Sequence, residues 1–281
     1  MTRIDRRALF TSGAAAALLA ATGTSLAAKP QPGGNLRLAL PRADRHLDRV
    51  AHRAVLDGLT EIGPDGLLRG ELATGWHSTG GGRIWRFELR QGVAFHDGRS
   101  FEAADAVASL QGRGLLQEGV AAVTATGAHE IEITLDRPNP HLPYVLAGSE
   151  FLITPGGKVA SALDQLCGTG CYRVERAQEG RHLRALRQVD HYKEGQAGWV
   201  DSFEVIVIPD ERVRAEALLE GFVDVAALPR AEMLQKQAGL RFFPTQEDVA
   251  LAARQAVGMP QKIGTQSPLD DGRIAERWWM S

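Results

Sequence analysis

The order of hydrophobic and polar residues along the chain predicts a mixed α/β protein. Apolar and polar residues alternate, as they do in half-buried strands, over residues 35–40 (NLRLAL) and 130–135 (EIEITL). The alternation returns from residue 172 through 181–187, and again over 203–208. Helices are predicted over residues 46–58, 101–110, 144–147, 211–220 and 248–256. The chain contains no internal repeat and no low-complexity segment.

Turn and capping residues mark the ends of several of these elements. Trp76 and residues 85–89 flank the Gly-rich segment 78–82, which is the pattern of a β-hairpin. Ser100 precedes the helix predicted at 101–110 and can cap it.

A βαβ unit is predicted further along the chain. Asp210 can cap the helix that follows it, and Gly221 ends that helix. A strand predicted at 222–226 comes next. With strand 203–208 before the helix, this order implies a parallel pair of strands.

Residues 1–28 have the three parts of a cleavable export signal. A basic start is followed by an apolar run at 14–21 and by small residues at 25–28. The segment 5–10 (DRRALF) is similar to a twin-arginine signal, and a general secretory signal that contains two arginines is the alternative. Both imply export, so we expect residues 29–281 to form the mature chain in the periplasm.

Composition excludes several classes of protein. With 44% hydrophobic and 23% charged residues, the chain is typical of a globular protein and not of a disordered one. Its 32 basic and 34 acidic residues leave no basic surplus, so we expect no nucleic-acid partner. No apolar run of about 18 residues follows the signal, so no membrane span is expected in the mature chain.

Motifs for catalysis and for cofactor binding are absent from the sequence. It contains no HExxH, no GxSxG, no P-loop and no GxGxxG that opens a helix. The 8 histidines are scattered without the spacing of metal ligands. We therefore expect neither an enzyme nor a cofactor nor a metal site. A metal site assembled from residues distant in sequence is the alternative left open.

The two cysteines form the most specific local pattern. Cys167 and Cys171 are separated only by Gly-Thr-Gly, and in an oxidising compartment such a pair can close a small ring. This predicts a disulfide that acts as a local staple. A strained reducible switch, a thiol pair for a soft metal and two free thiols are the alternatives.

Eight segments in series carry a pattern that is more specific than any of them alone. They are residues 33–40 (GGNLRLAL), 56–66 (LDGLT and DG), 72–76 (LATGW), 87–98 (FELRQGVAFHDG), 101–107 (FEAADAV), 168–172 (GTGCY), 190–192 (DHY) and 221–224 (GFVD). In order and spacing they resemble the extracellular solute-binding proteins of peptide and nickel ABC transporters, family 5. One departure is Cys171, which stands where the family has Pro in a GTGPY turn.

The resemblance implies a periplasmic-binding-protein-like lobe, with a mixed sheet flanked by helices. We expect residues 60–155 to form a subdomain of this lobe. Family members are nearly twice as long and close two lobes around the solute, whereas residues 228–281 are too few to build a second lobe. We therefore expect a one-lobed form in which the second lobe is largely absent and a closing tail at 271–279 is kept.

The candidate ligand-binding residues follow from expected loop positions, not from matched contacts. The ligand face is predicted at the end of the first strand and beside loop 168–172. Its residues are Arg42, Asp44, His46, Trp76, Thr169 and Tyr172. His96 and the other aromatic residues of the family-like segments are expected to have structural roles.

Two functions are consistent with the sequence. The first is a periplasmic solute-binding protein that delivers peptides or similar small solutes to an ABC permease. The second is an accessory or scaffold subunit that binds a periplasmic partner protein through the lobe surface exposed by the missing second lobe. Trp278 and Trp279 fit either a buried clamp or a contact to such a partner.

Overall fold

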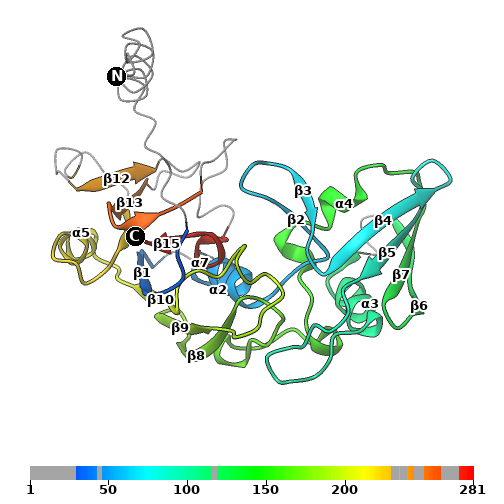
Figure 1. Ribbon diagram of the computed structural model, residues 1–281, viewed down its shortest axis with the longest axis horizontal. Coiled ribbons are helices and arrows are strands. Elements are labelled where there is room, and N and C mark those ends of the chain that lie inside the picture. The colour runs from blue at the N-terminus through cyan, green and yellow to red at the C-terminus, as the bar shows by residue number, and fades with distance from the viewer. Residues whose placement is uncertain are drawn as a thin grey trace, which may run out of the picture.

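The computed structural model describes residues 30–42, 46–115, 119–228, 234, 239–243, 250–260 and 272–281. The predicted export signal and Asp44 lie outside these residues. Figure 1 shows two sheets side by side, each with its own hydrophobic core. Among the described residues, no helix combines the length and the apolar character needed to cross a membrane.

The larger sheet has seven strands, in the order β12-β13-β11-β1-β10-β9-β8. Its centre is parallel, because β1 (Asn35–Leu40) lies between β10 (Ser202–Val207) and β11 (Val225–Leu228) and runs parallel to both. Helix α5 (Glu211–Leu219) connects β10 to β11, and the Asp210 carboxylate accepts hydrogen bonds from two main-chain N–H groups of its first turn. The predicted crossover is thus confirmed, with β1 inserted between its two strands.

Antiparallel strands complete the larger sheet on both sides. β8 (Tyr172–Gln178) and β9 (His182–Arg187) form a hairpin beside β10, while β12 (Leu240–Phe243) and β13 (Ala250–Arg254) lie beside β11. The helix predicted at 248–256 is wrong where the structure describes it, because residues 250–254 form β13. Leu251 and Ala253 face one core while Ala252 faces another. This strand is buried on both sides, so its sequence lacks the alternation by which strands are recognised.

The smaller sheet has the order β4-β5-β7-β6. The predicted hairpin is present as β4 (Ala73–Thr79) and β5 (Ile84–Leu89), and the predicted strand at 130–135 is β7 (Glu130–Leu135), paired with β6 (Val120–Gly127). Helix α3 (Ala103–Gly112) packs on this sheet. Glu102 caps α3 through a reciprocal capping box with Asp105, so the expected cap at Ser100 is wrong.

Short elements join the two sheets. Helix α2 (His46–Val55) packs on the larger sheet and ends three residues before the predicted 46–58 helix does. The hairpin of β2 (Thr60–Ile62) and β3 (Leu68–Gly70), and the short helix α4 (Leu142–Val145), lie toward the smaller sheet. Single turns of 3-10 helix follow at Ser149–Phe151, Pro155–Gly157 and Leu163–Gln165.

The C-terminal segment packs back onto the larger core. It consists of α7 (Ile274–Arg277), which contacts α2, and β15 (Trp279–Met280), which pairs with β14 (Val257–Gly258). Trp278 and Trp279 expose 2% and 4% of their surface. Both tryptophans are therefore packed inside the protein, as a buried clamp would be, and neither is available to a partner.

Candidate functional site

A cluster of five buried charged side chains lies where the two cores meet. We call it the junction cluster; its members are Asp57, Glu71, Lys193, Arg273 and Glu276. Asp57 follows α2, Glu71 follows β3, Lys193 lies in the loop between β9 and β10, and the remaining two belong to the C-terminal segment. None exposes more than 7% of its surface. The cluster thus joins three parts of the chain that are distant in sequence.

Lys193 is at the centre of this cluster. Its Nζ donates to Asp57 Oδ1 at 3.0 Å, to Glu71 Oε1 at 2.5 Å and to Glu276 Oε1 at 2.7 Å. These three bonds use every proton that a lysine ammonium can donate.

Arg273 supplies the second positive charge. Its Nη1 donates to Glu71 Oε1 at 2.8 Å and to Glu276 Oε2 at 2.6 Å, and its Nη2 donates to Glu71 Oε2 at 3.2 Å. Two carboxylates are therefore shared by two cations, which is the arrangement that makes buried charges tolerable.

The charges in the cluster hold one another ionised. Burial alone would raise the pKa of Glu71, but Arg273 and Lys193 outweigh it and hold this pKa well below its ordinary value. Burial opposes ionisation of Glu276 in the same way, and Lys193 and Arg273 lower its pKa to about 2. Burial favours a neutral Lys193, yet Asp57 and the two glutamates raise its pKa well above the ordinary value.

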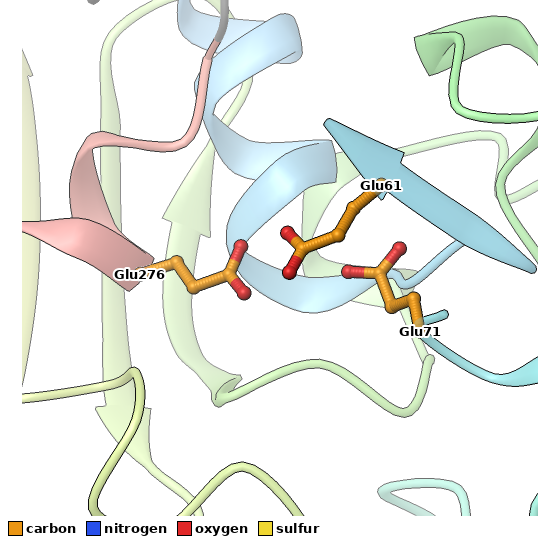
Figure 2. A group of neighbouring side chains, drawn as sticks. All are labelled: Glu61, Glu71 and Glu276. Carbon is orange, nitrogen blue, oxygen red and sulfur yellow. The ribbon is translucent and has the colours of Figure 1, made fainter. Parts of the chain in front are cut away.

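Three carboxylates at the junction are close enough to be considered as metal ligands. Oxygens of Glu61, Glu71 and Glu276 lie within 4.8 Å of one another, and Figure 2 shows the three side chains turned toward a common point. Lys193 and Arg273 already donate to these carboxylates. Because ammonium and guanidinium groups supply the positive charge, we assign no metal to this group.

The junction cluster predicts a specific loss of stability in acid. Glu71 and Glu276 have folded-state pKa values below the ordinary value of 4.5, and that of Glu276 is about 2. Their stabilisation is therefore complete above pH 4.5 and is lost as the pH falls through the folded-state pKa values. Glu61 acts in the opposite sense, because burial and the nearby Glu276 raise its pKa and protonation relieves that cost. Two of these three glutamates lose stabilisation in acid and one gains it, so we expect the free energy of unfolding to fall.

Urea unfolding between about pH 5 and pH 3 measures this loss. The variant Glu276→Gln is expected to lose part of the pH dependence, because it removes one of the two titrating groups. A wild-type protein that becomes more stable over this range would contradict the assignment.

Two of the predicted ligand-binding residues have their hydroxyl groups bonded inside the protein. Thr169 exposes 1% of its surface, and its Oγ1 donates to Asp57 Oδ2 at 2.9 Å. Tyr172 is fully buried, and its hydroxyl donates to the Val200 carbonyl at 3.1 Å. Both side chains therefore support the junction and the larger core in this structure, and a contact of either with a solute stays a prediction.

Three other predicted ligand-binding residues, Arg42, His46 and Trp76, lie in or next to three different elements. Arg42 is exposed just after β1, and His46 is buried in the first turn of α2. Trp76 lies on β4 and packs against Phe87 of the smaller core, with 6.2 Å between the ring centroids. None of these three residues lines the cavity described below, and their contact with a solute stays a prediction.

The prediction of a disulfide is wrong for this structure, because Cys167 and Cys171 are free thiols. The loop between them lies along the end of α2, where the Gly170 N–H donates to the Val55 carbonyl at 2.9 Å. At Gly168, a Cβ would lie 2.3 Å from that same carbonyl oxygen, so only glycine fits this close approach. A loop held this tightly against a helix does not curl to bring its two ends together.

Cys171 contacts a histidine and is not bonded to Cys167. It is buried, and its Sγ lies 3.7 Å from His191 Nδ1. Burial and the nearby Glu276 raise the pKa of its thiol well above the ordinary value, so Cys171 is an unreactive core residue.

A cavity of about 420 Å³ lies beside the junction cluster. Its walls come from the β2–β3 hairpin, from the loop before β10 and from the C-terminal segment. The charged residues in its lining are Glu61, Arg69, Arg90, Lys193, Glu276 and Arg277, and the aromatic ones are Tyr192, Trp199 and Trp279. Its size lies within the range of small-molecule sites.

No pattern in the sequence identifies the residues of the junction cluster and the cavity as one site. Asp57, Arg90 and Tyr192 lie inside family-like segments, and Lys193 directly follows one of them. No motif joins them, because the cavity forms only when segments more than 100 residues apart come together, as Lys193 and Glu71 do.

The larger sheet has a parallel centre, the smaller sheet precedes the β8–β9 hairpin in the chain, and a cavity lies at the junction of the two cores. Together these features define a lobe of a periplasmic binding protein. The sequence profile of the bacterial extracellular solute-binding proteins, family 5 Middle, matches residues 68–273. The chain therefore belongs to the family 5 solute-binding proteins.

Solved structures show the same fold. The periplasmic binding protein DppA from Helicobacter pylori, in complex with the peptide STSA, superposes with a TM-score of 0.67 at 20% identity, over 76% of this chain and 51% of that protein. AgaA from A. tumefaciens R10, in complex with agropinic acid, gives a TM-score of 0.66 at 24% identity, over 75% of this chain and 48% of AgaA.

Among curated relatives, the HTH-type transcriptional regulator SgrR of Salmonella typhi is 30% identical over 190 residues, which are 65% of this chain and 33% of that protein. The chain thus spans about half the length of the similar solved structures and about a third of this relative.

Proposed function

We propose that this protein is a periplasmic solute-binding protein that takes up a short peptide or a similar small solute and delivers it to an ABC transporter. The single observation that carries the proposal is the cavity of about 420 Å³, walled by three separate segments at the junction of the two cores. Membership of family 5 supports the same class of function.

The solutes in related structures support a small ligand. They include the peptide STSA in DppA, agropinic acid in AgaA and Ni(L-His) in NikZ from Campylobacter jejuni. The charged and aromatic lining suits a solute of this kind, because a few convergent polar groups fix its orientation while aromatic side chains cover its apolar part.

The alternative of an accessory subunit has less support. That function was expected to use the lobe surface exposed by the missing second lobe, and a partner contact was one of two roles considered for Trp278 and Trp279. Both are buried in the C-terminal segment. The cavity, in contrast, has the volume of a small-molecule site.

Native mass spectrometry of the mature chain, recovered from the periplasm of its own host, tests the proposal. We expect a small additional mass that is lost on collisional activation. The variant Gln196→Trp is expected to lose this mass, because Gln196 is exposed at the cavity and a larger side chain there blocks it. Glu194→Trp, on the same loop but outside the lining, is the matched control.

Two results would contradict the proposal. A stable complex with another polypeptide and no small mass would favour the accessory subunit. A bare chain that gives the same spectrum with and without Gln196→Trp would exclude the cavity as a site.

A further inference from the structure

A second cavity of the protein lies on the larger sheet, and we call it the sheet pocket. Its volume is about 470 Å³, and its described lining shares no residue with that of the cavity at the junction. All but one of the lining side chains are polar or charged: Asn35, Arg37, Arg184, Ser202, Glu204, Asp224, Arg254 and Met280. The proposed function makes no use of this pocket.

The alternation of side chains along the strands places the sheet pocket on the face of the sheet that α5 packs on. On β1, Leu36 and Leu38 belong to the larger core, so Arg37 between them faces the opposite side. Ala39 also faces that side and belongs to one cluster with Leu218 of α5. No residue of α5 lines the sheet pocket, which is therefore the part of this face beyond the helix.

Positive and negative side chains alternate across the strands at this pocket. Glu204 of β10 is in register with Arg37 of β1 on one side and with Arg184 of β9 on the other. Asp224, directly before β11, accepts from Arg37 Nε and Nη2, each at 3.0 Å. Arg254 of β13 continues the row, since its main-chain N–H donates to the Asp224 carbonyl at 3.0 Å. The row thus contains three guanidinium groups and two carboxylates.

Arg254 has the weakest counter-charge in this row. Its Nη1 lies 3.9 Å from Asp224 Oδ1, which already accepts from Arg37 Nη2 at 3.0 Å. Its side chain forms no hydrogen bond with any residue that the structure describes. Gly221 leaves room for the guanidinium, because a Cβ at this position would lie only 2.7 Å from Nη1. The pocket thus contains one guanidinium whose donors are free for a ligand.

The other two guanidinium groups of the pocket also have donors to spare. Arg184 pairs with Glu175 through its Nε at 2.7 Å, and its Nη groups form no hydrogen bond with a described residue. Arg37 uses its Nε and Nη2 for Asp224 and the Gly221 carbonyl, which leaves its Nη1. Because guanidinium groups donate and do not accept, the pocket offers hydrogen-bond donors from three strands.

The carboxylates of the pocket, in contrast, are engaged. Both oxygens of Asp224 accept from Arg37, and Glu204 Oε1 lies 2.6 Å from His182 Nε2. Three guanidinium groups against two carboxylates leave an excess of one positive charge in the lining. A surplus of donors together with positive charge is complementary to an oxyanion.

We propose that the sheet pocket is a second binding site, which holds a phosphate group at Arg254 and Arg37. These two guanidinium groups converge on one oxygen of Asp224, so a single anion can reach both. A phosphate presents oxygens on all sides and can accept from donors on several strands, whereas a carboxylate has two oxygens on one edge. The volume of about 470 Å³ accommodates inorganic phosphate as well as a small phosphate ester.

Calorimetric titration of the full chain with inorganic phosphate tests this inference. Sodium chloride holds the ionic strength constant, so that general attraction of anions to arginine is screened equally. We expect phosphate to bind about tenfold more tightly than acetate, and Arg254→Gln to weaken phosphate binding about tenfold. Arg212→Gln is the matched control, since Arg212 is exposed in the first turn of α5 and outside the lining. It is expected to leave phosphate binding unchanged.

NMR of the ¹⁵N-labelled wild type locates the site even if Arg254→Gln fails to fold. Phosphate is expected to shift the main-chain N–H signals of Arg37, Gly221 and Arg254 and to leave those of Gln196 and Arg277 at the other cavity in place. Glycerol phosphate distinguishes the source of the group. Tighter binding than that of inorganic phosphate identifies an ester and weaker binding the free ion, and both support the site.

Several results would overturn the inference. Wild type without saturable phosphate binding would remove the site, and equal affinities for phosphate and acetate would remove its selectivity. The same phosphate affinity in Arg254→Gln as in wild type would exclude Arg254 as the anchor. Shifts confined to the surroundings of Gln196 would assign the anion to the other cavity. None of these results bears on the proposed function, whose test is the solute retained at the junction.

Discussion

Replacing Lys193 with Met is expected to lower the free energy of unfolding by about 3–5 kcal/mol. The Lys193 ammonium donates to Asp57, Glu71 and Glu276, and its removal leaves three buried carboxylates with Arg273 as their main cation. Breaking a buried ion cluster on one side costs this much because the remaining charges stay desolvated and repel one another. Urea unfolding of wild type and variant measures the difference.

Two comparisons make this prediction specific. Arg86→Met breaks an exposed pair with Glu132 and is expected to cost no more than about 1 kcal/mol. In Lys193→Met, the loss of stability in acid should also be smaller than in wild type. The ammonium is one of the two cations that lower the pKa values of Glu71 and Glu276, so its removal reduces the stabilisation that protonation of these groups takes away. A Lys193→Met protein as stable as the Arg86 variant would show that the cluster does not hold the junction.

Replacing Trp278 with Ala is expected to cost about 3–5 kcal/mol, the range found for large aromatic side chains removed from a core. Trp278 exposes 2% of its surface, and its ring centroid lies 6.1 Å from that of Phe243 of β12. It lies between α7 and β15, so its loss also weakens the attachment of Glu276 and Trp279, which line the cavity.

The matched control for Trp278 is an exposed aromatic residue. Phe222→Ala, at a side chain that is 63% exposed, is expected to change stability by no more than about 0.5 kcal/mol. Hydrogen exchange then locates the effect. In Trp278→Ala we expect the N–H groups of residues 274–280 to lose protection first, and equal protection in wild type and variant would contradict the role of Trp278 as a clamp.

The sequence predicted those elements in which local pattern and tertiary environment agree. β1, β5 and β7 each bury one face more deeply than the other, so their alternation is visible without knowledge of the fold. Asp210 satisfies the N–H groups of its own helix, a local interaction that sequence reasoning finds.

Prediction failed where distant partners decided the structure. β13 read as a helix because both of its faces are covered, on one side by the main core and on the other by the core beneath α5. Cys167 and Cys171 are close in sequence, but the packing of their loop against Val55 keeps the loop from closing.

The junction cluster was beyond sequence reasoning for the same reason. Lys193 is separated from Asp57 by 136 residues and from Glu276 by 83, so no spacing rule relates them. Thr169 was chosen as a ligand-binding residue because its loop was expected to lie beside the ligand face. Its hydroxyl donates to Asp57, which no local pattern reveals.

A crystal structure of the chain with the solute that it retains from the periplasm tests the central claim most directly. We predict density for the solute in the cavity of about 420 Å³, beside Tyr192, Gln196 and Arg277 of its lining. Density at Arg42 and His46, with the junction cavity free of solute, would contradict this account and restore the ligand face expected from the sequence.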